Sequence, residues 1–120
     1  ASWVKNLIDN NTTTAVTFDA VGEYVEITFK TPIILLGFRY YGHETHHQDG
    51  SYKIEYYDGV AWHDLKTGIP TRLNSWSDWD FTITKLVKGK KIRVTATAID
   101  TVGYNRPYEW EFYGLLAICE

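Results

Sequence analysis

Aromatic, basic and amide side chains gather in three polar stretches, residues 42–50, 66–80 and 99–107. An aromatic ring can stack on the apolar C–H face of a sugar, while Arg, His and Asn exchange hydrogen bonds with its hydroxyls. The stretches supply these groups as His43, His46, His47, Arg72, Asn74, Trp76, Trp79, Tyr104, Asn105 and Arg106. Residue types in this combination predict a sugar-binding pocket built from the three stretches.

Two other uses of these residues remain open. Trp76 or Trp79 would serve equally well as an apolar plug at the bottom of a β-sandwich. The three histidines, with Glu44 or Asp49, have a spacing that would suit zinc or another transition metal. A His-rich loop that bonds to sugar hydroxyls is the simpler interpretation.

Catalytic motifs are absent from the sequence. It contains no Gly-x-Ser-x-Gly, no phosphate-cradling glycine loop and no His-Glu-x-x-His. The lone cysteine, Cys119, stands next to the last residue and is a poor candidate nucleophile. The sequence therefore predicts a protein that is not an enzyme.

The composition limits the classes of partner that the protein could bind. Phe, Tyr and Trp make up 16% of the 120 residues, enough both to fill a β core and to line a ligand surface. The formal net charge of −3 gives no basic excess, which argues against nucleic acid because phosphate binding needs clustered Lys and Arg. The same balance gives no electrostatic attraction to an anionic membrane.

The length predicts one domain over residues 1–120 with a core that needs no disulfide. One cysteine also excludes an internal disulfide. The sequence has no methionine, including at position 1, so we expect a processed chain or a piece of a larger protein.

Alternating apolar and polar residues predict that the chain is made of short strands. They are expected at residues 24–29, 33–41, 52–57, 60–65, 81–84, 92–98 and 108–114. Asp58-Gly59 predicts a tight hairpin because both residues tolerate positive φ. Trp62 and Trp110 are expected in the core. With no helical period, the pattern predicts an all-β antiparallel sandwich of the jelly-roll type.

Four stretches, in this order, resemble the discoidin or coagulation-factor type C domains and the related family 32 carbohydrate-binding modules. They are residues 7–14, 24–38, 52–65 with its Asp-Gly hairpin, and the Glu-led closing strand 109–114. The resemblance implies a galactose-binding-like jelly roll. It also implies an extracellular, cell-surface or virion-surface module that targets a parent enzyme, cell or virion to glycans. Such a module binds weakly through one site, so several copies in a multimeric parent would act together.

The resemblance also implies a galactose-type pocket made by a His, an Arg, an Asn and an aromatic ring. The matching residues here are His47, Arg72, Asn74 and Trp76, with Trp79 nearby and Tyr104 or Arg106 on a third wall.

Relatives of this kind often hold a structural calcium ion, which prefers six to eight oxygen ligands. Carried over, the ligands would be Asp9, Asn11 and Thr14 of the early loop, with Glu109 closing the site. The alternative is that Asp9-Asn10-Asn11 forms a solvated turn and Glu109 is an edge carboxylate.

Two non-sugar functions stay open. A protein-adhesion or scaffolding domain would use Trp76 and Trp79 as interface anchors. A phospholipid-binding domain is disfavoured because Ser77, Asp78 and Asp80 surround these tryptophans with polar and acidic groups.

Overall fold

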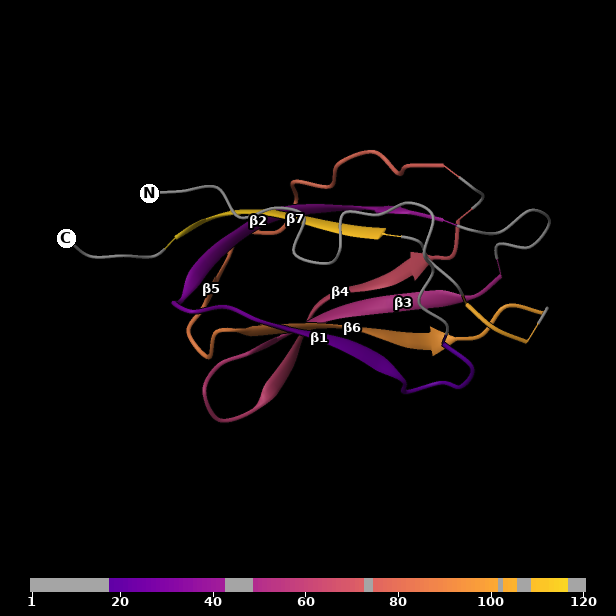
Figure 1. Cartoon of the computed structure of the whole chain (residues 1–120), viewed down its shortest axis with the longest axis horizontal. Helices are drawn as coiled ribbons and strands as arrows, with labels where there is room; N and C mark the ends of the chain where they lie inside the picture. Colours follow the sequence, from indigo (N-terminus) through magenta and orange to yellow (C-terminus); the bar gives the residue numbers. More distant parts are fainter. Residues whose placement is uncertain (1–17, 43–48, 73–74, 102, 106–108, 117–120) are drawn as a thin grey trace.

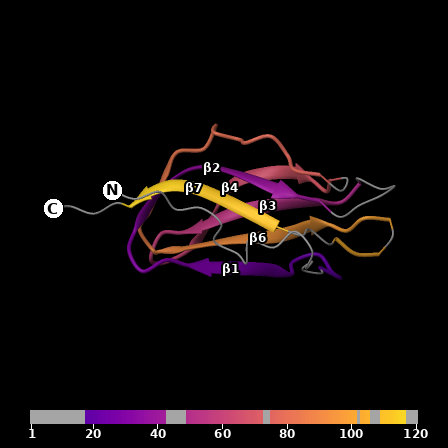
Figure 2. The same cartoon turned by 45° about the horizontal axis from the view of Figure 1, so that its top comes forward.

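The described residues form seven strands in two sheets. The structure, a computed structural model, describes residues 18–42, 49–72, 75–101, 103–105 and 109–116. The strands are β1 (Tyr24–Thr28), β2 (Ile33–Tyr41), β3 (Ser51–Tyr57), β4 (Trp62–Pro70), β5 (Lys85–Val87), β6 (Lys91–Ala98) and β7 (Glu109–Leu116). They form antiparallel sheets in the orders β1-β6-β3-β4 and β5-β2-β7, which face each other (Figure 1 and Figure 2). The predicted all-β sandwich is confirmed, and no described segment is a helix able to cross a membrane.

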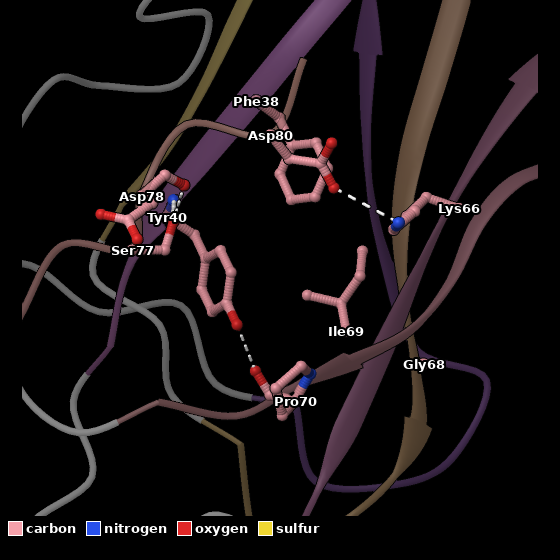
Figure 3. A pocket seen from close by; sticks show the side chains of 9 residues that line it. All are labelled: Phe38, Tyr40, Lys66, Gly68, Ile69, Pro70, Ser77, Asp78 and Asp80. Atoms are coloured by element: carbon pink, nitrogen blue, oxygen red, sulfur yellow. Dashed lines mark hydrogen bonds and ion pairs between the residues drawn. The ribbon is translucent and has the colours of Figure 1, made fainter. Parts of the chain in front are cut away.

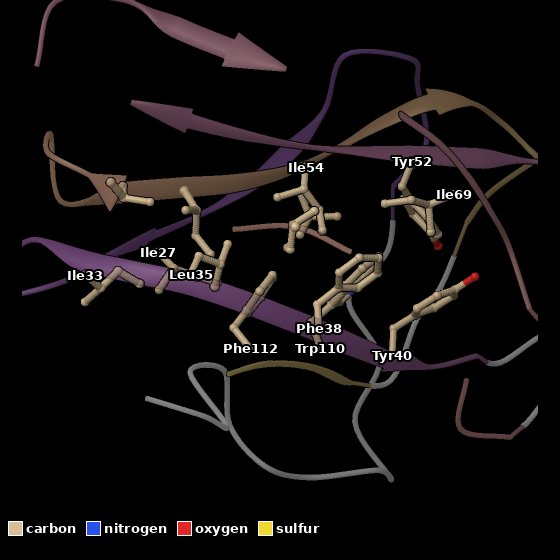
Figure 4. Packing of buried hydrophobic residues seen from close by; sticks show 14 of the residues in the cluster. Ile27, Ile33, Leu35, Phe38, Tyr40, Tyr52, Ile54, Ile69, Trp110 and Phe112 are labelled. Atoms are coloured by element: carbon tan, nitrogen blue, oxygen red, sulfur yellow. The ribbon is translucent and has the colours of Figure 1, made fainter. Parts of the chain in front are cut away.

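The core lies between the sheets, where the inward positions of the alternating strands meet. Ile33 and Leu35 of β2 are fully buried, and Ile54 and Ile92 are fully buried on the opposite sheet (Figure 4). Toward the other end the core becomes aromatic, with the rings of Phe38, Tyr40, Tyr52 and Trp110 in mutual contact. Trp110 therefore occupies the core as predicted.

The hairpin between β3 and β4 is confirmed. Gly59 has φ of 104°, the left-handed region that glycine adopts without strain. Asp58 Oδ1 accepts hydrogen bonds from the N–H groups of Val60 (2.7 Å) and Ala61 (2.8 Å), while Oδ2 meets His63 Nε2 at 2.6 Å. The aspartate thus holds both sides of the turn.

Trp62 corrects a prediction, because it lies on the outer face of its sheet and not in the core. It pairs with Tyr57 across the hairpin, and its half-buried ring lies 4.2 Å from the Arg93 guanidinium carbon. Apolar–polar alternation divides the residues of a strand between two faces but does not say which face is buried. The register of the hairpin determines that Trp62 lies on the outer face.

Residues 81–84 are not a strand, contrary to prediction; the strand in this region is β5. Asp80 Oδ1 accepts from both the N–H (2.8 Å) and the hydroxyl (2.5 Å) of Thr82, so a local turn replaces ladder bonds. The predicted loop 66–80 also begins later, because β4 continues to Pro70.

Residues 75–80, hereafter the 75–80 segment, run beside β2 on the edge that β5 leaves open. Phe38 and Asp80 exchange backbone hydrogen bonds of 2.9 and 3.1 Å, and Ser77 N–H donates to Tyr40 O at 2.8 Å. Gly37 makes this approach possible: a Cβ there would lie 2.5 Å from Phe81 Cδ1 and 2.7 Å from Asp80 O. The segment is therefore fixed against the sheet.

Candidate functional site

A buried polar network joins the three stretches that the sequence singled out. Asp100 Oδ1 accepts hydrogen bonds from Gly50 N–H (2.6 Å) and from the Thr71 hydroxyl (2.7 Å). Asn105 Oδ1 accepts from Asp100 N–H at 2.8 Å, and its amide nitrogen donates to Ala98 O at 2.8 Å. Since Gly50, Thr71 and Asp100 come from different stretches, the network holds all three together at one end of the sandwich.

Close packing and surface hydrogen bonds reinforce this loop end. A Cβ on Gly50 would lie 2.5 Å from Asn105 Oδ1, so the residue must be glycine for the network to close. Asp49 accepts hydrogen bonds from the hydroxyl and the N–H of Thr101, and these bonds lower the Asp49 pKa to about 2. The carboxylate therefore stays ionised at neutral pH.

Arg72 follows Thr71 directly and is half-buried at this loop end. Its Nε is buried and has no hydrogen-bond partner in the part of the chain that the structure describes. Burial raises the pKa of the nearby Tyr40 hydroxyl, an effect that the positive charge of Arg72 partly offsets. Tyr40 donates to Pro70 O at 2.5 Å, so its hydroxyl is already engaged. Arg72 thus carries an unsatisfied donor beside a rigid wall.

The two predicted tryptophans lie on the outer face of the β5-β2-β7 sheet. Both rings contact Arg39 of β2, whose guanidinium carbon is 4.0 Å from the Trp76 ring centre and 5.0 Å from that of Trp79. Arg39 in turn forms two hydrogen bonds to Glu111 of β7, Nε to Oε2 at 3.3 Å and Nη2 to Oε1 at 3.1 Å. The tryptophans are neither core plugs nor isolated spikes.

The other predicted site residues are placed as follows. Tyr104 is half-buried next to Asn105 of the buried network. His47, Asn74 and Arg106 lie outside the described residues, as do His43, His46, Asp9, Asn11 and Thr14. Glu109 opens β7, and its side chain is likewise outside the description. Among the described residues, no three His, Cys, Asp or Glu side chains form a group that could hold a metal ion. The calcium site stays a prediction.

A hollow of about 370 Å³ opens beside Arg39. We call it the Arg39 hollow; Arg39, Trp79, Phe81, Glu111 and Tyr113 line it. Sequence reasoning missed all of these except Trp79. Alternation puts Arg39 on one face of its strand, but the pairing of Arg39 with Glu111 depends on the register of two strands that are 72 residues apart.

A second hollow, of about 200 Å³, lies between β4 and the 75–80 segment (Figure 3). Phe38, Tyr40 and Ile69 form its apolar surface. Across its mouth Lys66 Nζ meets Asp80 Oδ2 at 3.3 Å. Burial would raise the pKa of Asp80, yet hydrogen bonds from Thr82 and Lys66 outweigh it and lower that pKa. The ion pair ties the two sheets together at this open side.

Comparison with known proteins shows which structures share this fold. No protein-family model matches the chain, and no curated protein matches its sequence. A family 32 module of AlyQ in complex with 4,5-unsaturated mannuronic acid has a TM-score of 0.70 and 16% identity, over 89% of this chain and 82% of that chain. The family 32 module of C. perfringens NanJ in complex with galactose has a TM-score of 0.69 and 13% identity, over 93% and 92%.

A longer protein contains the same fold as one part. Truncated AlyQ, with family 32 and alginate lyase domains, has a TM-score of 0.72 and 15% identity, over 94% of this chain and 29% of that chain. These similarities define the class: this chain has the jelly-roll sandwich fold of the family 32 carbohydrate-binding modules, as the resemblance predicted.

Proposed function

We propose that the protein is a non-catalytic carbohydrate-binding module whose sugar pocket lies at the loop end around Arg72. The observation that carries this proposal is the buried Nε of Arg72, which has no hydrogen-bond partner among the described residues. A buried donor without an acceptor costs about 1–3 kcal/mol, and a sugar hydroxyl that reached Nε after a small shift of the Arg72 side chain would recover part of that cost. The adjacent network supports the proposal because a fixed wall reduces the entropy lost on binding.

The finer features are part of the proposal. His47, Asn74 and Arg106 would complete the pocket with Tyr104, and an axial hydroxyl of a galactose-type sugar would accept from the charged donors. Two of the similar structures are named as complexes, one with 4,5-unsaturated mannuronic acid and one with galactose. The fold alone therefore does not identify the sugar. The module would target a larger, extracellular or surface-bound protein to glycans, with calcium held by Asp9, Asn11, Thr14 and Glu109.

Calorimetric titration with galactose, N-acetylgalactosamine and fucose, preceded by a glycan array, tests the proposal. We expect dissociation constants on the order of micromolar to millimolar, because a sugar offers few apolar atoms. Arg72→Ala should weaken binding at least about tenfold, as expected for a lost charge-assisted bond. Lys88→Ala, an exposed change in the turn between β5 and β6, is the control. Absence of binding to every glycan, even by multimerised protein, would refute the function.

A further inference from the structure

We propose a second sugar-binding surface on the outer face of the β5-β2-β7 sheet, centred on the Arg39 hollow. Its ligand is a neutral pyranose unit of a glycan chain. The inference rests on the proposed function for the class of ligand, but it uses different residues. Outward side chains of β2 and β7 and of residues 79–81 form this surface, whereas the proposed pocket is built around Arg72.

The aromatic part of the hollow offers apolar surface for the C–H face of a sugar. The Trp79 and Phe81 rings are stacked in nearly parallel planes, with centroids 5.6 Å apart and 14° between their planes. Tyr113 stands at an angle to both rings and closes one side. Phe81 is 56% exposed although a folded protein gains by burying such a ring. Phe81, stacked on Trp79, therefore offers the exposed apolar ring of the hollow.

The polar part supplies directional bonds without net charge. The two hydrogen bonds from Arg39 to Glu111 use two of the five N–H donors of a guanidinium. Because arginine and glutamate compensate each other, the hollow gives no electrostatic preference for phosphate or another anion. A neutral polyhydroxylated ligand matches both the rings and this pair.

The size and rigidity of the hollow also fit a small ligand. Its volume of about 370 Å³ lies near the lower end of the range for small-molecule sites, roughly 300–1,000 Å³. The backbone bonds between Phe38 and Asp80 fix the 75–80 segment next to Trp79, and Arg39 contacts the rings of both Trp76 and Trp79. The side chains that line the hollow would therefore lose little conformational entropy when a sugar binds.

The opposite sheet provides a matched control. There Arg93 lies between Tyr24 (4.8 Å) and Trp62 (4.2 Å) and makes two hydrogen bonds to Glu55. Trp62→Ala removes a tryptophan ring that contacts an arginine, as Trp79→Ala does, but on the outer face of the other sheet. It reports what the loss of such a contact does to the fold alone.

The test is an NMR titration of Arg72→Ala with galactose, N-acetylgalactosamine, fucose, glucose and mannose, added to about 50 mM to reach weak sites. We expect saturable shifts at the Trp79 indole N–H and the Phe81 amide with at least one sugar. Trp79→Ala in this background should weaken binding at least tenfold, Trp79→Phe should retain most of it, and Trp62→Ala should leave it within twofold. Urea midpoints verify that each variant is folded.

The outcomes separate the two proposals. Shifts confined to the loop end in the unmodified chain would overturn the second surface and leave the proposed function standing. Shifts at Trp79 without any effect of Arg72→Ala would support the second surface and refute the pocket around Arg72. Self-association that depends on Trp79, with no sugar-induced shift there, would overturn the inference in favour of a protein interface.

Discussion

Two arginines, one on each outer face, share an unusual environment. Arg39 and Arg93 each lie between two aromatic rings and bond through Nε and Nη2 to one glutamate. Glu55 and Glu111 are both buried, and their arginines compensate the charges; Lys53 Nζ, 3.8 Å from Oε2, adds to the compensation of Glu55. The rings cover part of each guanidinium and add a cation–π attraction to it.

Removal of the Glu55 charge should destabilise the protein. Burial would raise the pKa of Glu55, but hydrogen bonds from Arg93 and Thr95 outweigh it and lower that pKa. Glu55→Gln should cost about 2 kcal/mol in the free energy of unfolding, below the value for a fully buried pair because Arg93 is partly exposed. Urea denaturation measures the change. Glu26→Gln, which is exposed and opposite Arg93 on β1, should have a much smaller effect.

Acid should weaken the β3–β4 hairpin through Asp58. Hydrogen bonds from Ala61, His63 and Val60 lower the Asp58 pKa to about 2, from an ordinary value of 3.8. A depressed pKa contributes stability above the unfolded-state value, and that contribution is lost as pH falls from about 4 to 2. NMR titration of the Asp58 carboxyl should give the low pKa. In Asp58→Asn, unfolding free energy should vary less over this window; an unchanged pH dependence would contradict the assignment.

At the level of elements, three loops depend on one glycine. Gly50→Ala places a methyl against Asn105 Oδ1 and Asp100 N, so the network has to open. We expect a loss of about 2–3 kcal/mol in unfolding free energy, with faster amide exchange at Thr71 and Asp100. Hydrogen exchange read by NMR checks the location. Unchanged protection at both residues would show that the network does not hold the loops.

The elements also show how far the sequence predicts the molecule. A run that starts apolar on both faces located β2, and period-two alternation located β6, both almost to the residue. Alternation misplaced Trp62, whose side of the sheet depends on hairpin register, and residues 81–84, where Asp80 competes for the backbone. The Arg39 hollow escaped prediction because its residues meet through pairing of β2 with β7 and through the close approach at Gly37.

For the whole molecule, the proposed calcium site predicts linkage between metal and folding. A ligand that binds only the folded chain stabilises it, by about 2.7 kcal/mol at a concentration of 100 Kd. The thermal midpoint should therefore rise when calcium replaces EDTA, and Asp9→Ala should abolish the rise. Equal midpoints in calcium and EDTA, measured by calorimetry, would contradict the site.

The irregularity of β4 affects how copies of this protein behave at high density. β4 is an edge of its sheet, and a long flat edge strand invites pairing with another chain and growth into fibrils. Two register shifts against β3 distort this edge, and Pro70 ends it without an N–H to donate. We expect many copies at high concentration to remain separate, because the register shifts and Pro70 interrupt the row of backbone donors and acceptors that β4 offers a neighbour.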